Sequence, residues 1–176
     1  MLTNNIIYAA GILFYSKSLD GTPYFLLGKD YENKWSNFGG RAEISDRSDY
    51  ETTASRECWE ETLGSIYDYP ELKTVVKRSG HKHLVFKTPS GHPYYMFVIK
   101  IPFNNNYRDK FLCTKKFLSN IDTDKKFLEM NDIKWVSVDT IKLSIKGNNK
   151  RPVIKLRNVF EQNLSTYFDP IMELMT

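Results

Sequence analysis

The sequence predicts a single α/β domain spanning residues 1–176. Segments rich in β-branched and aromatic residues are mixed with segments whose apolar residues recur at helical spacing, and such mixtures form layered sheets covered by helices. A chain of 176 residues, 41% hydrophobic and 26% charged, is long enough to bury a core and has the composition of a globular domain. No internal repeat, low-complexity segment or long linker divides it.

Composition also narrows the class of protein. The apolar run IIYAAGILFY is about half the length needed to span a bilayer, and no basic segment precedes it. The two cysteines, Cys58 and Cys113, form no metal-binding or redox spacing, which is typical of reduced thiols inside cells. We therefore expect a soluble, cytoplasmic protein without a signal peptide or a membrane partner. The net charge of +4 mildly favours anionic partners but falls short of a nucleic-acid-binding tail.

Strand-like and helix-like segments follow one another along the chain. The first two strands are joined by the turn sequence SLDGTP, which favours a hairpin. Strands are expected at 4–17, 24–31, 71–78, 82–88, 93–101 and 132–138. Helices are expected at 48–64 and 110–120, and an amphipathic helix at 151–168 with Pro152 in its first turn.

The helix expected at 48–64 has marked ends. Ser48 followed by Glu51 fits a capping box, in which the serine oxygen accepts from a first-turn amide and the glutamate reaches back. Gly64 supplies the stop, because glycine readily adopts the left-handed conformation that ends a helix. The motif RECWEE therefore lies on a helix rather than on a loop.

Three glutamates crowd one face of this helix. At about 100° per residue, Glu57, Glu60 and Glu61 share an arc of about 100°. Arg56 lies outside that arc, at roughly −100° from Glu57, and is expected to pair with only one edge of the cluster. Like charges this close destabilise a helix by roughly a few tenths of a kcal/mol per pair, whereas a hard divalent cation such as Mg²⁺ binds them. The alternative is a solvated acidic face held by ordinary ion pairs.

A longer motif surrounds the glutamates. Residues 39–64, GGRAEISDRSDYETTASRECWEETLG, resemble the signature of the Nudix (MutT-like) hydrolases: a glycine, five residues, an acid, then RE, a hydrophobic residue, any residue, EE and a glycine. The flanking stretches AAGILFY, KWSNFGG and EMNDIKWVSV are similar to the family's upstream strand, its approach to the motif and its late strand. The resemblance implies the Nudix fold, a mixed β-sheet sandwiched between α-helices (α/β/α), with a loop–helix–loop catalytic motif.

The motif departs from the family pattern in three places. Asp46 stands where glutamate is usual, and nine residues rather than seven separate it from Arg56. Leu63 is inserted before Gly64, giving EETLG where EETG is usual. The helix itself is intact, so metal binding is expected to survive. The pairing of Arg56 with Asp46, and the shape of the loop between them, are left open by these changes.

The resemblance also implies roles for individual residues. Glu57, Glu60 and Glu61 are the expected ligands of Mg²⁺ (or Mn²⁺), with the Gly40 carbonyl as a fourth, and Arg56 is expected to orient a carboxylate rather than touch the substrate. The reaction would be attack of water on a phosphorus of a pyrophosphate linkage. Glu60 or Glu61 could act as the general base, and so could an acid before the late strand, where Glu129 is preferred to Asp132; either of these two could instead be a plain loop carboxylate.

Residues near the glycine pair Gly39–Gly40 are candidates for substrate binding. Lys29, Trp35, Phe38 and Arg41 could stack a base or hold phosphate, although Trp35 and Phe38 could equally belong to the core. The aromatic residues of the strand at 93–101, among them Tyr94, fit sheet packing better than a stacking platform.

The resemblance leaves the substrate open. The preferred prediction is a free nucleotide or nucleotide conjugate, and the alternative is hydrolysis of an mRNA cap or RNA 5′ end. A basic groove reaching residues 150–157 would favour RNA, and a closed pocket would favour a small nucleotide. A third reading is a non-catalytic nucleotide-binding module. The abundance of Asn, Lys, Ile, Tyr and Phe is typical of AT-rich genomes, including those of large DNA viruses.

Overall fold

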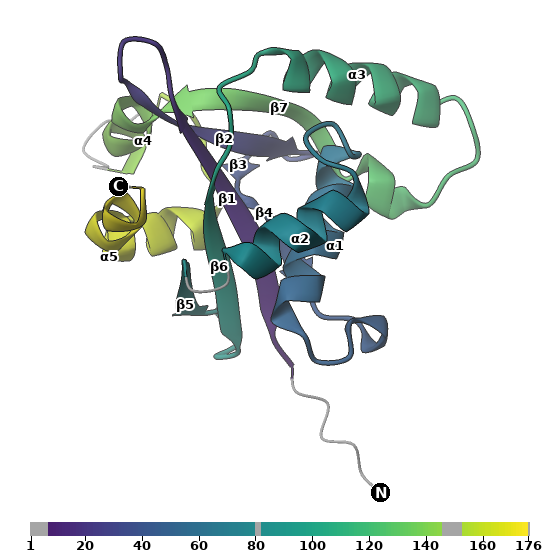
Figure 1. The fold of residues 1–176 in the computed structure, drawn as a ribbon, viewed down its shortest axis with the longest axis horizontal. Helices are drawn as coiled ribbons and strands as arrows, with labels where there is room; N and C mark the ends of the chain where they lie inside the picture. Colours follow the sequence, from purple (N-terminus) through teal and green to yellow (C-terminus); the bar gives the residue numbers. More distant parts are fainter. Residues whose placement is uncertain (1–6, 80–81, 146–152, 176) are drawn as a thin grey trace, which may run out of the picture.

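The computed structural model describes residues 7–79, 82–145 and 153–175. A mixed seven-stranded sheet forms its centre, and helices cover both faces (Figure 1). The strands are β1 (Ala9–Lys17), β2 (Pro23–Asp30), β3 (Trp35–Ser36), β4 (Phe38–Arg41), β5 (His83–Lys87), β6 (Pro93–Lys100) and β7 (Met130–Ser137). The helices are α1 (Tyr50–Thr62), α2 (Tyr69–Arg78), α3 (Asn106–Leu118), α4 (Val138–Ile145) and α5 (Asn158–Leu174), with short 3₁₀ turns η1 (Ile44–Asp46) and η2 (Lys125–Leu128).

Strand β1 organises the sheet. It pairs in parallel with β6 along one edge, while its other edge is divided between two antiparallel partners: residues 14–17 pair with β2 and residues 9–12 pair with β4. Strand β7 pairs with the far edge of β2. Strands β2 and β4 therefore lie beside different parts of β1, and β2 alone of these two continues the sheet. Within the described residues β4 pairs with no strand other than β1, which leaves its outer edge free for side chains from elsewhere.

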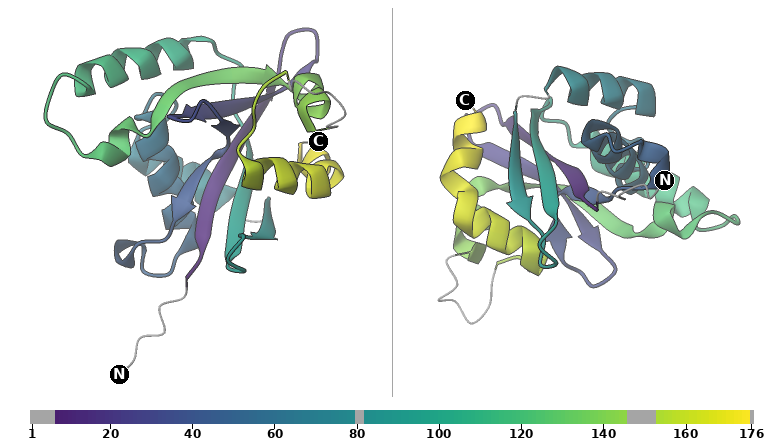
Figure 2. Two further views of the ribbon diagram at one scale, coloured as in Figure 1. Left: turned by 180° about the vertical axis from the view of Figure 1, so that it is seen from behind. Right: turned by 90° about the horizontal axis from the view of Figure 1, so that it is seen from below.

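Two apolar cores hold the layers together. One contains Phe14, Phe38 and Cys58 and lies between the sheet and α1, α2 and α3. The other contains Leu13 and Leu164 and lies between the opposite face of the sheet and α4 and α5. The view from below shows α5 on one side of β1 and β6, and α1 and α2 on the other (Figure 2). The predicted α/β class, with a mixed sheet between helices, is therefore confirmed.

The strand predicted at 71–78 is wrong, because this segment is helix α2. Asp68 caps the helix by accepting from the Glu71 amide, and Pro70 lies in its first turn. Leu72 and Val76, four residues apart, both point into the core. The adjacent β-branched residues Val75 and Val76 favour a strand locally. The buried residues Leu72 and Val76 are four positions apart, however, which is the spacing of one face of a helix packed against α1.

The predicted capping box at Ser48 is also wrong. Asp49 is the N-cap of α1 and accepts from the Glu51 amide, while Arg47 and Ser48 before it both have positive φ angles, of 53° and 60°. These two left-handed residues accommodate the longer loop by turning the chain sharply from η1 into α1. At the other end, the inserted Leu63 is itself left-handed (φ 54°) and is followed by Gly64 (φ 64°).

Other boundaries differ more modestly. Helix α3 begins at Asn106 rather than at 110, and the final helix begins at Asn158, because Leu156 instead forms a β-bridge with Trp35. Pro152 lies outside the described residues. Helix α4 was not predicted. In the described ranges, no helix has the length and apolar character needed to cross a membrane.

Candidate functional site

The guanidinium of Arg56 is the centre of a buried ion-pair network. It makes a two-pronged contact with Asp46, Nε to Oδ1 at 3.0 Å and Nη2 to Oδ2 at 2.9 Å. Nη2 also donates to the Arg41 carbonyl at 2.9 Å. Asp46 Oδ2 further accepts from the Glu43 amide and the Thr53 hydroxyl, so both oxygens of this buried carboxylate are hydrogen-bonded. The longer loop thus preserves the pairing of Arg56 with the upstream acid.

Arg56 also reaches two of the three crowded glutamates. Its Nη1 lies 3.0 Å from Glu57 Oε1 and 3.3 Å from Glu60 Oε2. The expectation that it pairs with only one edge of the cluster is therefore wrong, because a long arginine side chain lies across the helix surface instead of projecting straight out. Burial alone would lower the pKa of Arg56, but its bond to Asp46 and the charges of Glu57 and Glu60 raise it overall.

Glu57 and Glu61 both lie at the free edge of β4, where Glu61 is buried and Glu57 is partly buried. Burial raises the pKa of Glu57 to about 7, against the opposing charge of Arg56. Burial and the charge of Glu57 raise the pKa of Glu61 well above its usual value, although Glu61 Oε2 accepts from the Gly39 amide at 2.6 Å. Two carboxylates in this position are unfavourable when both are charged, unless a cation joins them.

Glu60 points away from this pair. One oxygen faces Arg56, and the other, Oε1, accepts from Lys126 Nζ at 2.8 Å. Lys126 comes from η2, which is held against α1 by an edge-to-face contact between Phe127 and Trp59. Within the described ranges, no group of three or more His, Cys, Asp or Glu side chains is arranged to hold a metal ion. At this site Glu60 is paired with Arg56 and Lys126, and its carboxylate therefore does not join those of Glu57 and Glu61.

The glycine pair separates the carboxylates from the opposite side of β4. A Cβ added at Gly40 would collide with the Glu57 carboxylate, whereas one added at Gly39 would collide with Gly11 and with the Tyr94 hydroxyl. Because Gly39 gives its N–H to Glu61, its carbonyl also points to the free edge, while the antiparallel register directs the Gly40 carbonyl toward β1. The carbonyl best placed to join the carboxylates is therefore that of Gly39, not that of Gly40.

The residues present fit a hard divalent cation. The donors at the free edge are oxygens only, two carboxylates and one carbonyl, which is the ligand type that Mg²⁺ and Mn²⁺ prefer. Burial raises the pKa of both Glu57 and Glu61, so a cation shared by the two carboxylates would offset the cost of burying their charge. Glu57, Glu61 and the Gly39 carbonyl would hold such an ion, with Glu60 able to join only after leaving Lys126.

A substitution at Gly40 tests metal binding without disturbing the fold. Gly40→Ala is expected to keep the fold but push the Glu57 carboxylate aside, because the colliding atoms are the end of a flexible side chain. We expect the affinity for Mn²⁺, followed by electron paramagnetic resonance, to fall by about 10-fold to 100-fold. Gly39→Ala meets backbone atoms of Gly11 and Ala10 and should lower the melting temperature instead. Unchanged Mn²⁺ affinity in Gly40→Ala would contradict this placement of the ion.

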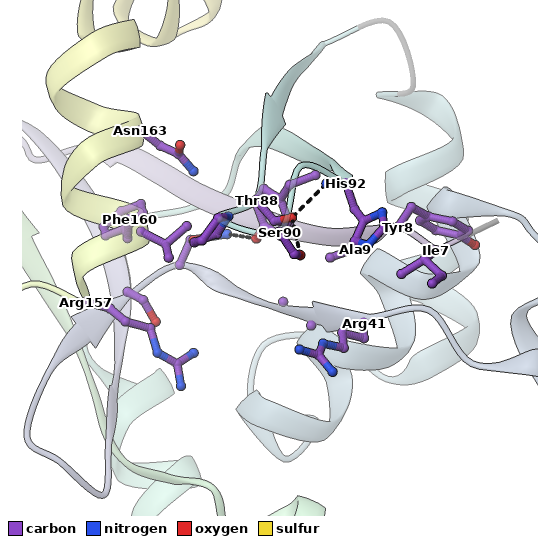
Figure 3. A pocket seen from close by; sticks show the side chains of 17 residues that line it. Ile7, Tyr8, Ala9, Arg41, Thr88, Ser90, His92, Arg157, Phe160 and Asn163 are labelled. Atoms are coloured by element: carbon purple, nitrogen blue, oxygen red, sulfur yellow. Dashed lines mark hydrogen bonds between the residues drawn. The ribbon is translucent and has the colours of Figure 1, made fainter. Parts of the chain in front are cut away.

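A cavity of about 540 Å³ lies beside the glycine pair. Strand β4, the turn at residues 88–92 and the first turns of α5 line it, and Arg41 and Arg157 lie on opposite sides (Figure 3). Inside it, Asn37 Nδ2 donates to the Tyr94 hydroxyl at 2.6 Å. Burial raises the pKa of Tyr94, so this phenol stays protonated at neutral pH. The cavity is large enough for a nucleotide.

Comparison with solved structures identifies the architecture. An Ap4A hydrolase from C. elegans, solved as a binary complex, superposes with a TM-score of 0.52 over 95% of this chain and 97% of its own, at 15% identity. The NUDIX domain of Shewanella oneidensis NrtR complexed with ADP ribose gives 0.51 over 94% and 87%, at 9% identity. The chain has the Nudix fold. No protein-family model and no curated protein matches the sequence.

Of the four residues predicted to bind substrate in this Nudix fold, Arg41 alone lines the cavity. Phe38 is fully buried in the core under α1, and its ring cannot stack a base. Trp35 belongs to the core under α5, where Lys29 Nζ lies 5.5 Å and Lys134 Nζ 4.4 Å from the centre of its ring. Of the two roles left open for Trp35 and Phe38, core packing is the one observed, and Trp35 adds cation–π contacts.

The two acids before the last strand differ in their surroundings. Asp132 is held by Arg108 in a two-pronged contact at 2.8 and 3.0 Å, which occupies both of its oxygens. Glu129, exposed at the end of η2, lies close enough for its charge to raise the pKa of both Glu57 and Glu61. Glu129 is therefore the acid that faces the carboxylate pair.

Sequence reasoning missed two residues of the site, Lys126 and Asn37, and named Arg157 only as the end of a possible basic groove at 150–157. Lys126 comes from a segment far from the Nudix motif, and nothing in its local sequence marks it as a neighbour of Glu60 on α1. Asn37 immediately precedes Phe38 and Gly39, and this position beside the motif is the one signal that could have drawn attention to it.

Proposed function

We propose that this protein is a divalent-metal-dependent pyrophosphohydrolase that acts on a nucleoside diphosphate derivative, either a free nucleotide or a nucleotide conjugate. The observation that carries the proposal is the pair of carboxylates formed by buried Glu61 and partly buried Glu57, beside the Gly39 carbonyl and a nucleotide-sized cavity. A structural acidic helix would leave its carboxylates in solvent, where their charge costs little. Here Glu61 is buried and Glu57 is partly buried, which is consistent with a site that gains a cation.

Each residue then has a defined part. A bound Mg²⁺ or Mn²⁺ would neutralise phosphate oxygens and lower the pKa of the attacking water. Glu57 and Glu61 hold the ion, and Arg56 fixes Glu57 by tying it to Asp46. Glu129 accepts the proton of the water, because it is exposed and faces the pair without a basic partner among the described residues. Arg41 lines the adjoining cavity and faces the part of the substrate outside the linkage being cleaved.

The size of the cavity favours a small substrate. A volume of about 540 Å³ holds one nucleotide, and β4, α5 and the turn at residues 88–92 enclose it on three sides. The two superposed proteins are an Ap4A hydrolase and a domain complexed with ADP ribose. Ap4A and ADP ribose are both adenosine compounds that contain linked phosphates. RNA cap or 5′-end hydrolysis is the second candidate, and Arg157 at one side of the cavity is the observation that favours it.

The test is a side-by-side turnover assay with Mg²⁺. One arm contains free nucleotides and conjugates such as ADP-ribose and diadenosine tetraphosphate, and the other contains cap-labelled RNA. We expect turnover in the first arm, abolished by Glu61→Gln and retained by Glu51→Gln, a matched change in the first turn of α1. Cap release alone would establish the second candidate. Metal and nucleotide binding without turnover in either arm would show a binding module.

A further inference from the structure

Two arginine side chains in the cavity lack strong partners. The Arg41 guanidinium makes no hydrogen bond or ion pair with any described residue, since the Arg56 contact is to its backbone carbonyl. Arg157 has a single loose ion pair, Nε to Asp30 Oδ2 at 3.5 Å, and the other Asp30 oxygen is occupied by the Glu32 and Lys34 amides. Both arginines point into the same space from opposite sides (Figure 3).

The surroundings of Arg157 add further groups that attract an anion. Arg157 is the N-cap of α5, a 17-residue helix whose N-terminus has no side-chain cap, and residues of its first turn line the cavity. Uncapped amides and the helix dipole both favour negative charge there. Ser36, which also lines the cavity, has a buried Oγ with no hydrogen-bond partner among the described residues. An unsatisfied buried hydroxyl is unfavourable unless a ligand supplies its partner.

The positive charge exceeds what a diphosphate requires. In the proposed reaction, Glu57 and Glu61 would hold an ion that neutralises the two phosphates being separated. Arg41 and Arg157 lie on the far side of the glycine pair from those carboxylates, so they are placed for anionic groups further along the substrate. A linear run of phosphates can pass the bare backbone of the glycines, where any side chain would block it.

We propose that the substrate carries a chain of three or more phosphates, and that Arg41 and Arg157 bind the phosphates beyond the pair being cleaved. The inference rests on the proposed function and deepens it, since it selects free nucleoside polyphosphates over diphosphate conjugates. Arginine suits this role because its planar fork makes paired hydrogen bonds with phosphate oxygens.

The kinetic test compares two substrates in matched variants. Arg41→Gln and Arg157→Gln are expected to lower kcat/KM for diadenosine tetraphosphate by at least about tenfold, the loss of one charged hydrogen bond. The value for ADP-ribose, which has only two phosphates, should change by less than about threefold. Arg78→Gln, which removes one exposed arginine from the end of α2, is the charge control. Equal losses on both substrates, or no loss on either, would overturn the proposal.

A binding measurement keeps the proposal separate from catalysis. Isothermal titration of the wild-type protein with inorganic tripolyphosphate and with pyrophosphate, without metal, needs no turnover. Tighter binding of tripolyphosphate that is lost in Arg157→Gln would support the polyphosphate site even if the turnover panel were silent. Equal affinity for the two anions would overturn it while leaving pyrophosphate hydrolysis intact. Melting temperatures of all variants verify that they are folded.

Discussion

Replacing Arg56 with alanine is expected to lower the free energy of unfolding by about 3–5 kcal/mol. The substitution leaves Asp46 buried with a negative charge and only neutral partners. It also removes the cation that contacts Glu57 and one of the two that contact Glu60. Removing one member of a buried ion pair costs more than the pair contributes, because the remaining charge is stranded. Urea denaturation at pH 7 measures the change.

The chain contains its own control for this prediction. Arg108 binds Asp132 through the same pair of nitrogens, Nε and Nη2, as Arg56 binds Asp46. The Arg108 side chain is 51% exposed, whereas that of Arg56 is 12% exposed. Arg108→Ala should therefore cost no more than about 1 kcal/mol, since solvent screens the pair. Similar losses in Arg56→Ala and Arg108→Ala would show that burial does not govern the strength of the Arg56 network.

The second large effect concerns pH. Glu57 has a folded-state pKa of about 7 against a usual value of 4.5. Between those values the folded state binds more protons than the unfolded state, so the free energy of unfolding falls as pH rises through this window. The difference of about 2.5 units corresponds to about 3 kcal/mol of destabilisation above pH 7. Glu57→Gln cannot ionise and should remove most of this loss in the metal-free protein.

Urea denaturation at pH 4 and pH 8 with chelator measures this effect. We compare the free energy of unfolding of each variant with that of wild type at both pH values. The difference in favour of Glu57→Gln should be larger at pH 8 than at pH 4 by up to about 3 kcal/mol. For Glu51→Gln the difference should be the same at both pH values. Adding Mg²⁺ should stabilise wild type at pH 8 and leave Glu57→Gln almost unaffected, because a ligand stabilises only the state that binds it. A difference between variants that is independent of pH would contradict the burial of a charged Glu57.

Local sequence predicted some elements well and others poorly, for physical reasons that the individual cases show. Strands β1, β2 and β6 were predicted because their long runs of β-branched and aromatic residues have few alternatives. Helix α2 was missed because its two adjacent valines favour a strand locally, and packing under α1 reverses that preference. The N-cap of α1 is Asp49, one residue after the predicted Ser48, because Arg47 and Ser48 adopt left-handed conformations in the longer loop.

Residues close together in the chain were enough to predict the α/β class, the helix that carries Glu57, Glu60 and Glu61, and the likeness to the Nudix motif. The tertiary structure alone decided which of these carboxylates meet. It turned Glu60 toward Lys126, selected the Gly39 carbonyl, and brought Arg157 to the cavity. These outcomes depend on β1 dividing one edge between β2 and β4, a long-range pairing that no local stretch of sequence encodes.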